Sequence, residues 1–238
     1  DFDKLFVILP FEKDFFEKKH HFPVDFVGHP LIDAIHNRKP TDESVFRKEN
    51  ALDDRPIIAL LPGSRKQEIA KMLGVMLSVV ADFPAYQFVI AGAPSQEYAF
   101  YEQFLSHQNV KFISNKTYDL LSIAKAALVT SGTATLETAL FKVPEVVCYK
   151  GSWISYQIAK RIITLKYISL VNLIMDEAVV TELIQDEFNT GNLKKELEKL
   201  LDENHKKALL AQYDLLETKL GGIGASAKTA KFIINDLK

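Results

Sequence analysis

From residue 56 to residue 149 the chain alternates short apolar runs with longer amphipathic stretches. Short, nearly continuous apolar strands that alternate with helices are typical of βαβ units, so we predict a parallel sheet covered on both faces. The runs predict strands at 56–61, 86–92, 110–113, 126–130 and 145–149, and the intervening patterns predict helices at 66–82, 95–107, 117–124 and 133–142. This segment is expected to form a doubly wound α/β domain.

The flanking segments have a different pattern. Apolar runs at 5–9 and 24–28 predict two strands, and Pro30 with the polar stretch "HNRKPTDES" predicts a domain junction near residues 28–55. After residue 149 helical patterns dominate. They predict helices at 152–163, at about 177–187, and in three stretches between Gly191 and Lys238, the last two separated by "GGIGAS".

Composition narrows the class of protein. The 238 residues are 47% hydrophobic, enough for a sizeable core, and the net charge of -2 provides no overall field to attract nucleic acid. A single cysteine, Cys148, excludes an internal disulfide and favours a reducing, cytoplasmic compartment. No apolar run reaches the roughly 18 residues of a membrane span, and no signal-peptide pattern is present. The chain opens inside a strand-like run without a Met, so we expect it to be a fragment of a longer protein.

Two predicted strand ends carry candidate chemistry. In "ALLPGSRKQEI", Gly63 permits a tight turn, Ser64 could cap the next helix, and Arg65 places a permanently charged donor at the helix start. Together they would suit a phosphate at the carboxyl edge of a parallel sheet. The alternative is a capped helix with a solvated arginine.

The second strand end is "VTSGTATLETAL". Small residues at Ser131, Gly132 and Thr133 would let an anion approach backbone N–H groups, and Thr135 is a further candidate substrate contact. Glu137 would project back to the same edge, where paired ribose hydroxyls are a plausible partner. The alternatives are a plain helix cap and an exposed glutamate. Without a Walker lysine or an acidic metal-binding pair, a nucleotide or nucleotide sugar is the expected ligand.

Other motifs are ambiguous or absent. His29, between a glycine and a proline, could face an interdomain cleft or be a hydrogen-bonded structural residue. The basic and aromatic stretch 153–170 could touch a membrane or pack between domains, and we favour packing. No H-x-x-x-H pair and no G-x-S-x-G elbow occur, which disfavours a metal site and an α/β-hydrolase.

Five ordered motifs carry a resemblance to a known family. They are "LPFE" (9–12), "FVGHPLID" (26–33), "LLPGSRKQEI" (60–69), "SGTATLETAL" (131–140) and "SLVNLI" (169–174). Read in this order, they resemble lipid-A-disaccharide synthase, a glycosyltransferase of the two-domain GT-B architecture. The resemblance extends over nearly the whole chain.

The resemblance implies an activity. The family transfers 2,3-diacylglucosamine from its UDP carrier to 2,3-diacylglucosamine 1-phosphate, which gives a β-1,6 disaccharide and UDP without a metal or cofactor. Residues 1–40 would be a remnant of the N-terminal acceptor domain and linker, 41–220 the UDP-sugar-binding domain, and 221–238 a crossover helix. The general base would lie outside this chain. The full-length protein would be peripheral on the cytoplasmic face of the inner membrane of a Gram-negative bacterium.

The resemblance also assigns residues. Arg65 would stabilise charge on departing UDP, Asn172 matches a position implicated in activity, and Glu137 resembles the carboxylate that binds the ribose. The crossover helix would dock its apolar face on the residual strands or on another chain, so a homodimer is possible. That face comprises Ala230, Phe232, Ile233 and Leu237. The alternatives are a UDP-sugar epimerase-like enzyme and a noncatalytic nucleotide-binding module.

Overall fold

A computed structural model describes residues 3–105, 110–151 and 166–236 of the chain. Its centre is a six-stranded sheet in the order β5-β4-β3-β6-β7-β8, and every neighbouring pair is parallel. The strands are β3 (Ile57–Leu61), β4 (Gln87–Gly92), β5 (Val110–Ser114), β6 (Ala124–Thr130), β7 (Glu145–Tyr149) and β8 (Thr181–Ile184). The predicted doubly wound α/β fold is therefore confirmed.

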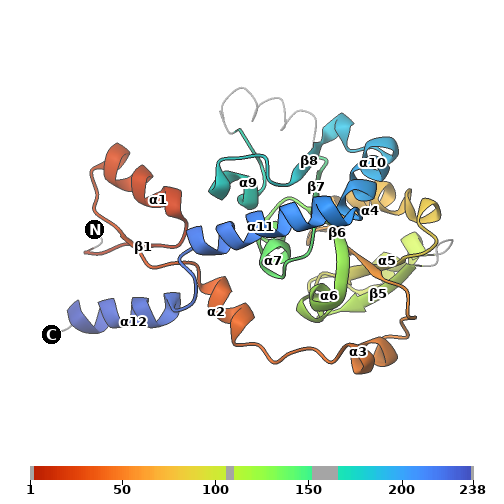
Figure 1. The fold of residues 1–238 in the computed structure, drawn as a ribbon, viewed down its shortest axis with the longest axis horizontal. Coiled ribbons are helices and arrows are strands. Elements are labelled where there is room, and N and C mark those ends of the chain that lie inside the picture. The colour runs from red at the N-terminus through yellow and green to blue at the C-terminus, as the bar shows by residue number, and fades with distance from the viewer. Residues whose placement is uncertain (1–2, 106–109, 152–165, 237–238) are drawn as a thin grey trace.

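The sheet is buried on both faces because its strands are apolar at nearly every position. All residues of β3 and β4 are buried, and alternate β3 residues join two separate hydrophobic clusters. Ile58 and Leu60 belong to the larger cluster, and Ile57 and Ala59 to the smaller one. The helices around the sheet are α4 (Lys66–Leu77), α5 (Tyr98–Leu105), α6 (Thr117–Ile123), α7 (Thr133–Leu140), α10 (Thr190–Leu200) and α11 (Glu203–Lys219), as Figure 1 shows.

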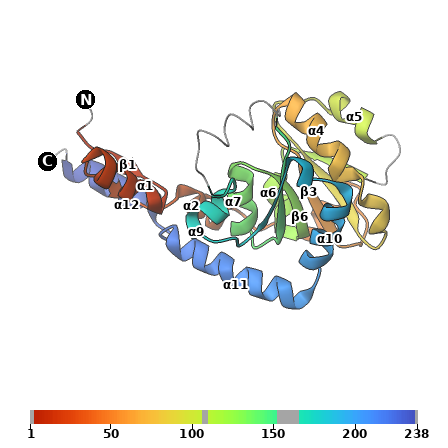
Figure 2. The same ribbon diagram turned by 90° about the horizontal axis from the view of Figure 1, so that it is seen from above.

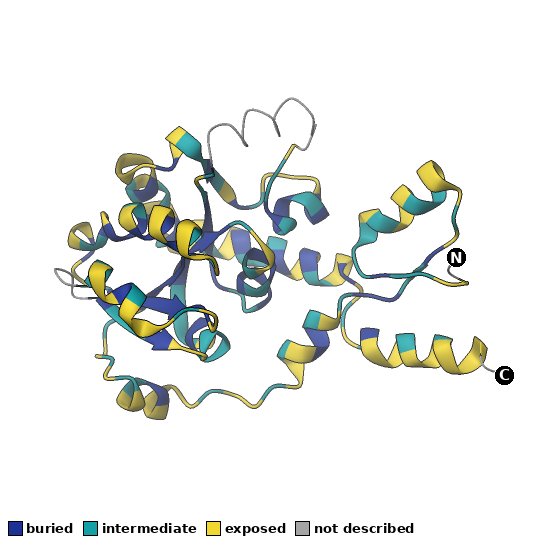
Figure 3. Cartoon of the chain, turned by 180° about the vertical axis from the view of Figure 1, so that it is seen from behind, coloured by how far each residue is buried: buried dark blue, intermediate teal, exposed yellow. Residues whose placement is uncertain are grey.

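A smaller unit lies to one side of the main sheet (Figures 1 and 2). It contains the parallel strands β1 (Phe6–Val7) and β2 (Asp25–Phe26), the helix α1 (Pro10–Asp14) with a π-helical turn at Phe15–Lys19, and α12 (Ala225–Asp236). The rings of Phe6 and Phe232 stack with their centroids 5.9 Å apart. The C-terminal helix thus docks on the short strands, as expected, although Figure 3 shows most of α12 exposed. Leu237 lies outside the described residues.

Two segments link the smaller unit to the main sheet, one after β2 and one before α12, and they meet at Gly28 and Gly221. Gly28, at a φ of +92°, lies against the Leu220–Gly221 backbone, and the His29 amide donates to the Leu220 carbonyl at 2.9 Å. Asp33 accepts from the Gly224 amide at 2.6 Å and from the Ser226 amide at 2.9 Å. The start of α12 is therefore fixed to α2 (Pro30–His36).

The stretch predicted as a junction contains structure of its own. It includes α2 and a further helix, α3 (Glu43–Glu49), whose first turn is capped by the Asp42 carboxylate. The polar segment between these helices and most of α3 are exposed or partly exposed.

Three helix predictions require correction or comment. The stretch 177–187 is not a helix but β8 followed by a 3-10 turn at Gln185–Glu187, because the edge of β7 supplies backbone partners that a local pattern cannot reveal. Another helix, α9 (Leu170–Met175), precedes it. The predicted helix 66–82 ends at Leu77, with a 3-10 turn at Val80–Asp82. The predicted helix 152–163 lies outside the described residues.

One acidic residue is buried in the core. Glu145, the first residue of β7, is fully buried, and neither of its carboxyl oxygens has a hydrogen-bond partner among the described residues. Burial raises the pKa of this carboxyl well above its usual value. The protonated form is therefore the one that the folded chain favours.

We expect Glu145→Gln to make folding stability less dependent on pH. Above pH 4.5 the unfolded glutamate loses its proton while the buried one keeps it, so rising pH favours unfolding until the raised folded pKa is passed. Within that window the wild-type chain should lose about 1.4 kcal/mol of unfolding free energy per pH unit relative to the variant. Urea unfolding at pH 5, 6 and 7 measures this difference. Exposed Glu177→Gln is the control, and parallel slopes for wild type and Glu145→Gln would contradict the expectation.

Candidate functional site

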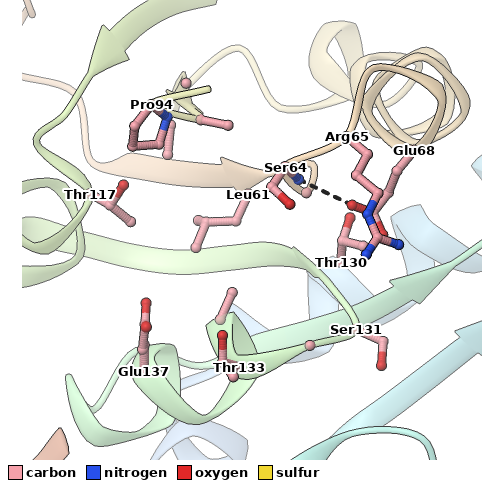
Figure 4. A pocket seen from close by; sticks show the side chains of 16 residues that line it. Leu61, Ser64, Arg65, Glu68, Pro94, Thr117, Thr130, Ser131, Thr133 and Glu137 are labelled. Atoms are coloured by element: carbon pink, nitrogen blue, oxygen red, sulfur yellow. Dashed lines mark hydrogen bonds between the residues drawn. The ribbon is translucent and has the colours of Figure 1, made fainter. Parts of the chain in front are cut away.

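A pocket opens at the carboxyl edge of the sheet, where the strand order reverses between β3 and β6 (Figure 4). Its volume is about 510 Å³, and the turns that follow β3, β4 and β6 form its walls. In doubly wound sheets this reversal point is where ligands bind, because the two adjacent turns diverge and leave a crevice. The residues that line it are Leu61, Gly63, Ser64, Arg65, Glu68, Ala91, Gly92, Ala93, Pro94, Thr117, Thr130, Ser131, Gly132, Thr133, Ala134 and Glu137.

The turn after β3 requires glycine at Gly63. Its φ is +103°, and a Cβ atom added there would lie 2.2 Å from the Glu68 carboxylate. Glu68 folds back from α4 and accepts a hydrogen bond from the Ser64 amide at 3.1 Å. The helix N-cap is Arg65 and lacks a side-chain cap, so the prediction that Ser64 caps α4 is wrong.

Arg65 is the cation of the pocket. Its side chain is exposed and extends into the pocket in Figure 4. Within the described part of the chain, no carboxylate lies within 4.0 Å of its guanidinium and no acceptor hydrogen-bonds to it. This contrasts with Arg38, Arg47 and Arg55, each of which pairs with a carboxylate. The guanidinium fork is thus available to an external anion.

The turn after β6 presents a second open helix start. Gly132 is the N-cap of α7 and provides no side-chain cap. The Thr135 amide donates to the Gly132 carbonyl at 3.3 Å, whereas the Thr133 and Ala134 amides have no acceptor within the described part of the chain. The Ser131 hydroxyl donates to the Ile168 carbonyl at 2.9 Å. Gly132 and Thr133 are exposed at the mouth. The partial positive end of α7 therefore faces the same space as Arg65.

Glu137 lies one turn into α7, with its side chain directed into the pocket (Figure 4). Burial raises the pKa of this carboxyl, and a hydrogen bond from the Tyr118 hydroxyl partly offsets the increase. Burial and the neighbouring Glu137 raise the pKa of Tyr118 to about 12. Sequence reasoning did not select Tyr118, because nothing in its local pattern indicates the contact with Glu137.

The structure brings most of the predicted residues together. Gly63, Ser64, Arg65, Ser131, Gly132, Thr133 and Glu137 all line this one pocket. Thr135 does not line it: its side chain is fully buried, and its hydroxyl donates to the Gly132 carbonyl at 2.8 Å. Its contribution is to fix the turn rather than to contact a ligand.

Asn172 does not line this pocket either. It is buried, and its amide nitrogen donates to the Val180 carbonyl and to the Glu182 carboxylate, each at 2.9 Å. Its oxygen accepts from the Val179 and Val180 amides, also at 2.9 Å. The side chain thus holds α9 against β8 and has no hydrogen-bonding capacity left for a substrate. A role for Asn172 in activity, which the family resemblance implies, stays a prediction; the contacts described here are all to the chain itself.

His29 has the structural role that was one of its two predicted readings. Its Nδ1 accepts a hydrogen bond from the Leu31 amide at 3.2 Å and thereby caps α2. Burial lowers the pKa of the imidazole, and the Glu12 carboxylate partly offsets this.

Two further features of the described residues bear on chemistry. No group of three or more His, Cys, Asp or Glu side chains among them could hold a metal ion. No helix among them is both long enough and apolar enough to span a bilayer.

The fold and the pocket together define a class of protein. The strand order and the helix starts at the reversal point are those of a Rossmann-like α/β unit, here the C-terminal half of a GT-B fold with additional C-terminal helices. The chain is similar in fold to UDP-GlcNAc 2-epimerase from Neisseria meningitidis bound to UDP-GlcNAc, with a TM-score of 0.63 and 17% identity over 98% of this chain and 60% of that one.

The chain belongs to the lipid-A-disaccharide synthetase family, whose sequence profile it matches over residues 1–231. It is 35% identical to lipid-A-disaccharide synthase of Syntrophus aciditrophicus (strain SB), over 99% of this chain and 63% of that protein. It is 34% identical to the synthase of Geobacter sulfurreducens, over 99% of this chain and 62% of that protein. The chain thus spans somewhat less than two thirds of the length of these relatives.

Proposed function

We propose that this chain is the UDP-sugar-binding part of a lipid-A-disaccharide synthase. The observation that carries the proposal is the convergence of Arg65 with the open starts of α4 and α7 at the point where the strand order reverses. A guanidinium with no acidic partner in the described part of the chain and two helix N-termini form an environment that suits a diphosphate. Glu137 lies further along the same pocket, where it would accept hydrogen bonds from the ribose hydroxyls.

In the proposed reaction, the donor is UDP-2,3-diacylglucosamine and the acceptor is a lipid monosaccharide 1-phosphate. An acceptor hydroxyl attacks the anomeric carbon, the bond from that carbon to the β-phosphate oxygen breaks, and the electron pair leaves with UDP. Arg65 and the helix starts stabilise the charge that develops on the departing diphosphate. The proton passes to a general base in the part of the family's length that this chain does not span. No metal or cofactor takes part.

The proposed division of the chain follows from this function. Residues 1–40 belong to the acceptor-domain remnant and linker, 41–220 to the UDP-sugar-binding domain and 221–238 to the crossover helix. The full-length protein would act on the cytoplasmic face of the inner membrane as a peripheral protein, and a homodimer through the crossover helix is part of the proposal.

We expect the chain to bind UDP with micromolar to millimolar affinity and to show negligible transferase activity by itself. Isothermal calorimetry with UDP, with CMP and uridine as comparison ligands, measures the binding. Absence of heat with UDP at millimolar protein and nucleotide would contradict the proposed site. Turnover of donor and acceptor by the chain alone would contradict the location of the base.

The runner-up is a UDP-sugar epimerase-like enzyme, favoured by the fold similarity to UDP-GlcNAc 2-epimerase. Incubation with UDP-GlcNAc distinguishes the two, because an epimerase would convert it without an acceptor. A noncatalytic nucleotide-binding module would bind UDP and remain inactive even when it is combined with the segment of its relatives that this chain does not span.

A further inference from the structure

A second pocket lies on the other side of the first turns of α4. Its volume is about 340 Å³, and its walls come from α4 and from the segment that follows β7. Arg65 and Glu68 line both this pocket and the nucleotide pocket, so the two spaces share a wall. The lining residues are Arg65, Lys66, Gln67, Glu68, Lys71, Met72, Tyr149, Lys150 and Gly151.

The charge in this second pocket is strongly unbalanced. Among the described residues that line it, Arg65, Lys66, Lys71 and Lys150 contribute four cations, against the one carboxylate of Glu68. Glu68 already accepts a hydrogen bond from the turn that precedes α4. The pocket therefore has a local excess of positive charge in a chain whose net charge is -2.

Within the described residues these cations lack acidic partners. Neither Lys71 nor Lys150 forms an ion pair or a side-chain hydrogen bond there, and Lys66 contacts only the face of the Phe100 ring, 5.9 Å from its centroid. Elsewhere in the same part of the chain lysines are commonly paired. Lys142, for example, contacts two carboxylates. Gathering unpaired like charges costs free energy that a bound anion would offset.

The position of the pocket indicates which anion it takes. It lies at the same edge of the sheet as the nucleotide pocket, and Tyr149 and Lys150 come from the carboxyl end of β7. We propose that this pocket binds the phosphate of a sugar phosphomonoester, next to the diphosphate in the first pocket. The identification of this phosphomonoester with the acceptor rests on the proposed function, because the proposed acceptor carries one phosphate and must approach the donor.

Arg65 couples the two pockets. A diphosphate in the first pocket neutralises part of the charge that the second pocket presents, so each ligand weakens the other while both can be bound. The coupling is reciprocal, because linkage requires that each ligand change the affinity of the other by the same factor.

The test uses glucose 1-phosphate as the probe, titrated into the chain by calorimetry with and without saturating UDP. We expect binding in both cases, weaker by a few-fold with UDP, and no binding of glucose. The double variant Lys71→Ala/Lys150→Ala should lose at least about 10-fold in affinity for glucose 1-phosphate, because each charged hydrogen bond contributes about 1.5–3 kcal/mol. Its affinity for UDP should remain within about 2-fold, since a neighbouring charge acts only through the field.

The matched control is Lys194→Ala/Lys199→Ala, which removes two surface lysines that pair with Asp82 and Glu196, line neither pocket, and should leave both affinities unchanged. Three outcomes would overturn the inference. The first is unchanged glucose 1-phosphate affinity in Lys71→Ala/Lys150→Ala, and the second is one-for-one competition between glucose 1-phosphate and UDP. The third is lysine-dependent sedimentation with phosphatidate vesicles without glucose 1-phosphate binding, which would make the cluster a membrane contact. If the wild-type chain binds glucose 1-phosphate but not UDP, the proposed function is refuted and the phosphate site is supported.

Discussion

Replacing Arg65 with alanine should weaken UDP binding by about 10- to 100-fold, because hydrogen bonds to charged groups contribute about 1.5–3 kcal/mol. The guanidinium lines the pocket and has no carboxylate partner among the described residues, so its removal breaks no ion pair there. The loss should therefore fall on the ligand and spare the fold. Calorimetry with UDP measures the affinity, and thermal unfolding checks that the variant remains folded.

The nucleotide series locates the effect within the ligand. Uridine should bind wild type and Arg65→Ala equally, UMP should show a smaller difference, and UDP the largest. Arg65→Lys keeps the charge but loses the planar fork, so its affinity should lie between the two. Lys207→Ala, an exposed lysine of α11, controls for net charge. Equal UDP affinity in wild type and Arg65→Ala would remove Arg65 from the diphosphate site.

Glu137→Gln should weaken UDP binding by about 10-fold, since an ionised carboxylate is a stronger acceptor than an amide oxygen for the ribose hydroxyls. The same substitution should have no effect on 2′,3′-dideoxy-UDP, which lacks both hydroxyls and should bind wild type as weakly as the variant binds UDP. This pair of ligands separates contact with the ribose from a general change in the pocket.

The pH dependence gives a second measurement of the same contact. Burial raises the pKa of Glu137, so as pH falls through this raised value the carboxylate gains a proton and UDP affinity should fall in wild type but not in Glu137→Gln. Comparing the two chains at each pH cancels the titration of the nucleotide itself.

Tyr118→Phe is the matched control for the carboxylate. It removes the hydrogen bond that favours the ionised form, so the fall in affinity should move to higher pH. Identical profiles for wild type and Glu137→Gln would show that the carboxylate does not contact the ribose.

The strands of the main sheet could be predicted because each is a continuous apolar run, and β3 to β7 appear within a residue or two of their predicted positions. The site followed from them, because parallel strands bring their carboxyl ends to one edge. Gly63 to Arg65 and Ser131 to Thr133 meet there although more than sixty residues of the chain separate them. The sequence pattern did not show that β3 and β6 are neighbours. Their pairing places the two turns side by side, so that both line one pocket.

The differences between the sequence pattern and the structure share a physical cause. The apolar spacing of 177–187 fits a helix as well as a strand, and the decision depends on the backbone of β7, which a local pattern does not contain. Asn172 and Thr135 look like ligand contacts because they are polar residues in conspicuous motifs. Burial directs their polar atoms to the chain itself. Tyr118 was missed because its contact with Glu137 spans two helices.

The crossing of Gly28 and Gly221 has a consequence for how this family can vary. A Cβ atom added to Gly221 would lie 3.0 Å from the Gly28 Cα, and one added to Gly28 would lie 3.2 Å from the Leu220 carbonyl oxygen. Both residues have a φ of +92°, so a side chain at either position is strained as well as crowded. Neither position can make room for a side chain at the other, because glycine is already the smallest residue. We therefore expect glycine at both positions in every relative whose chain makes this crossing.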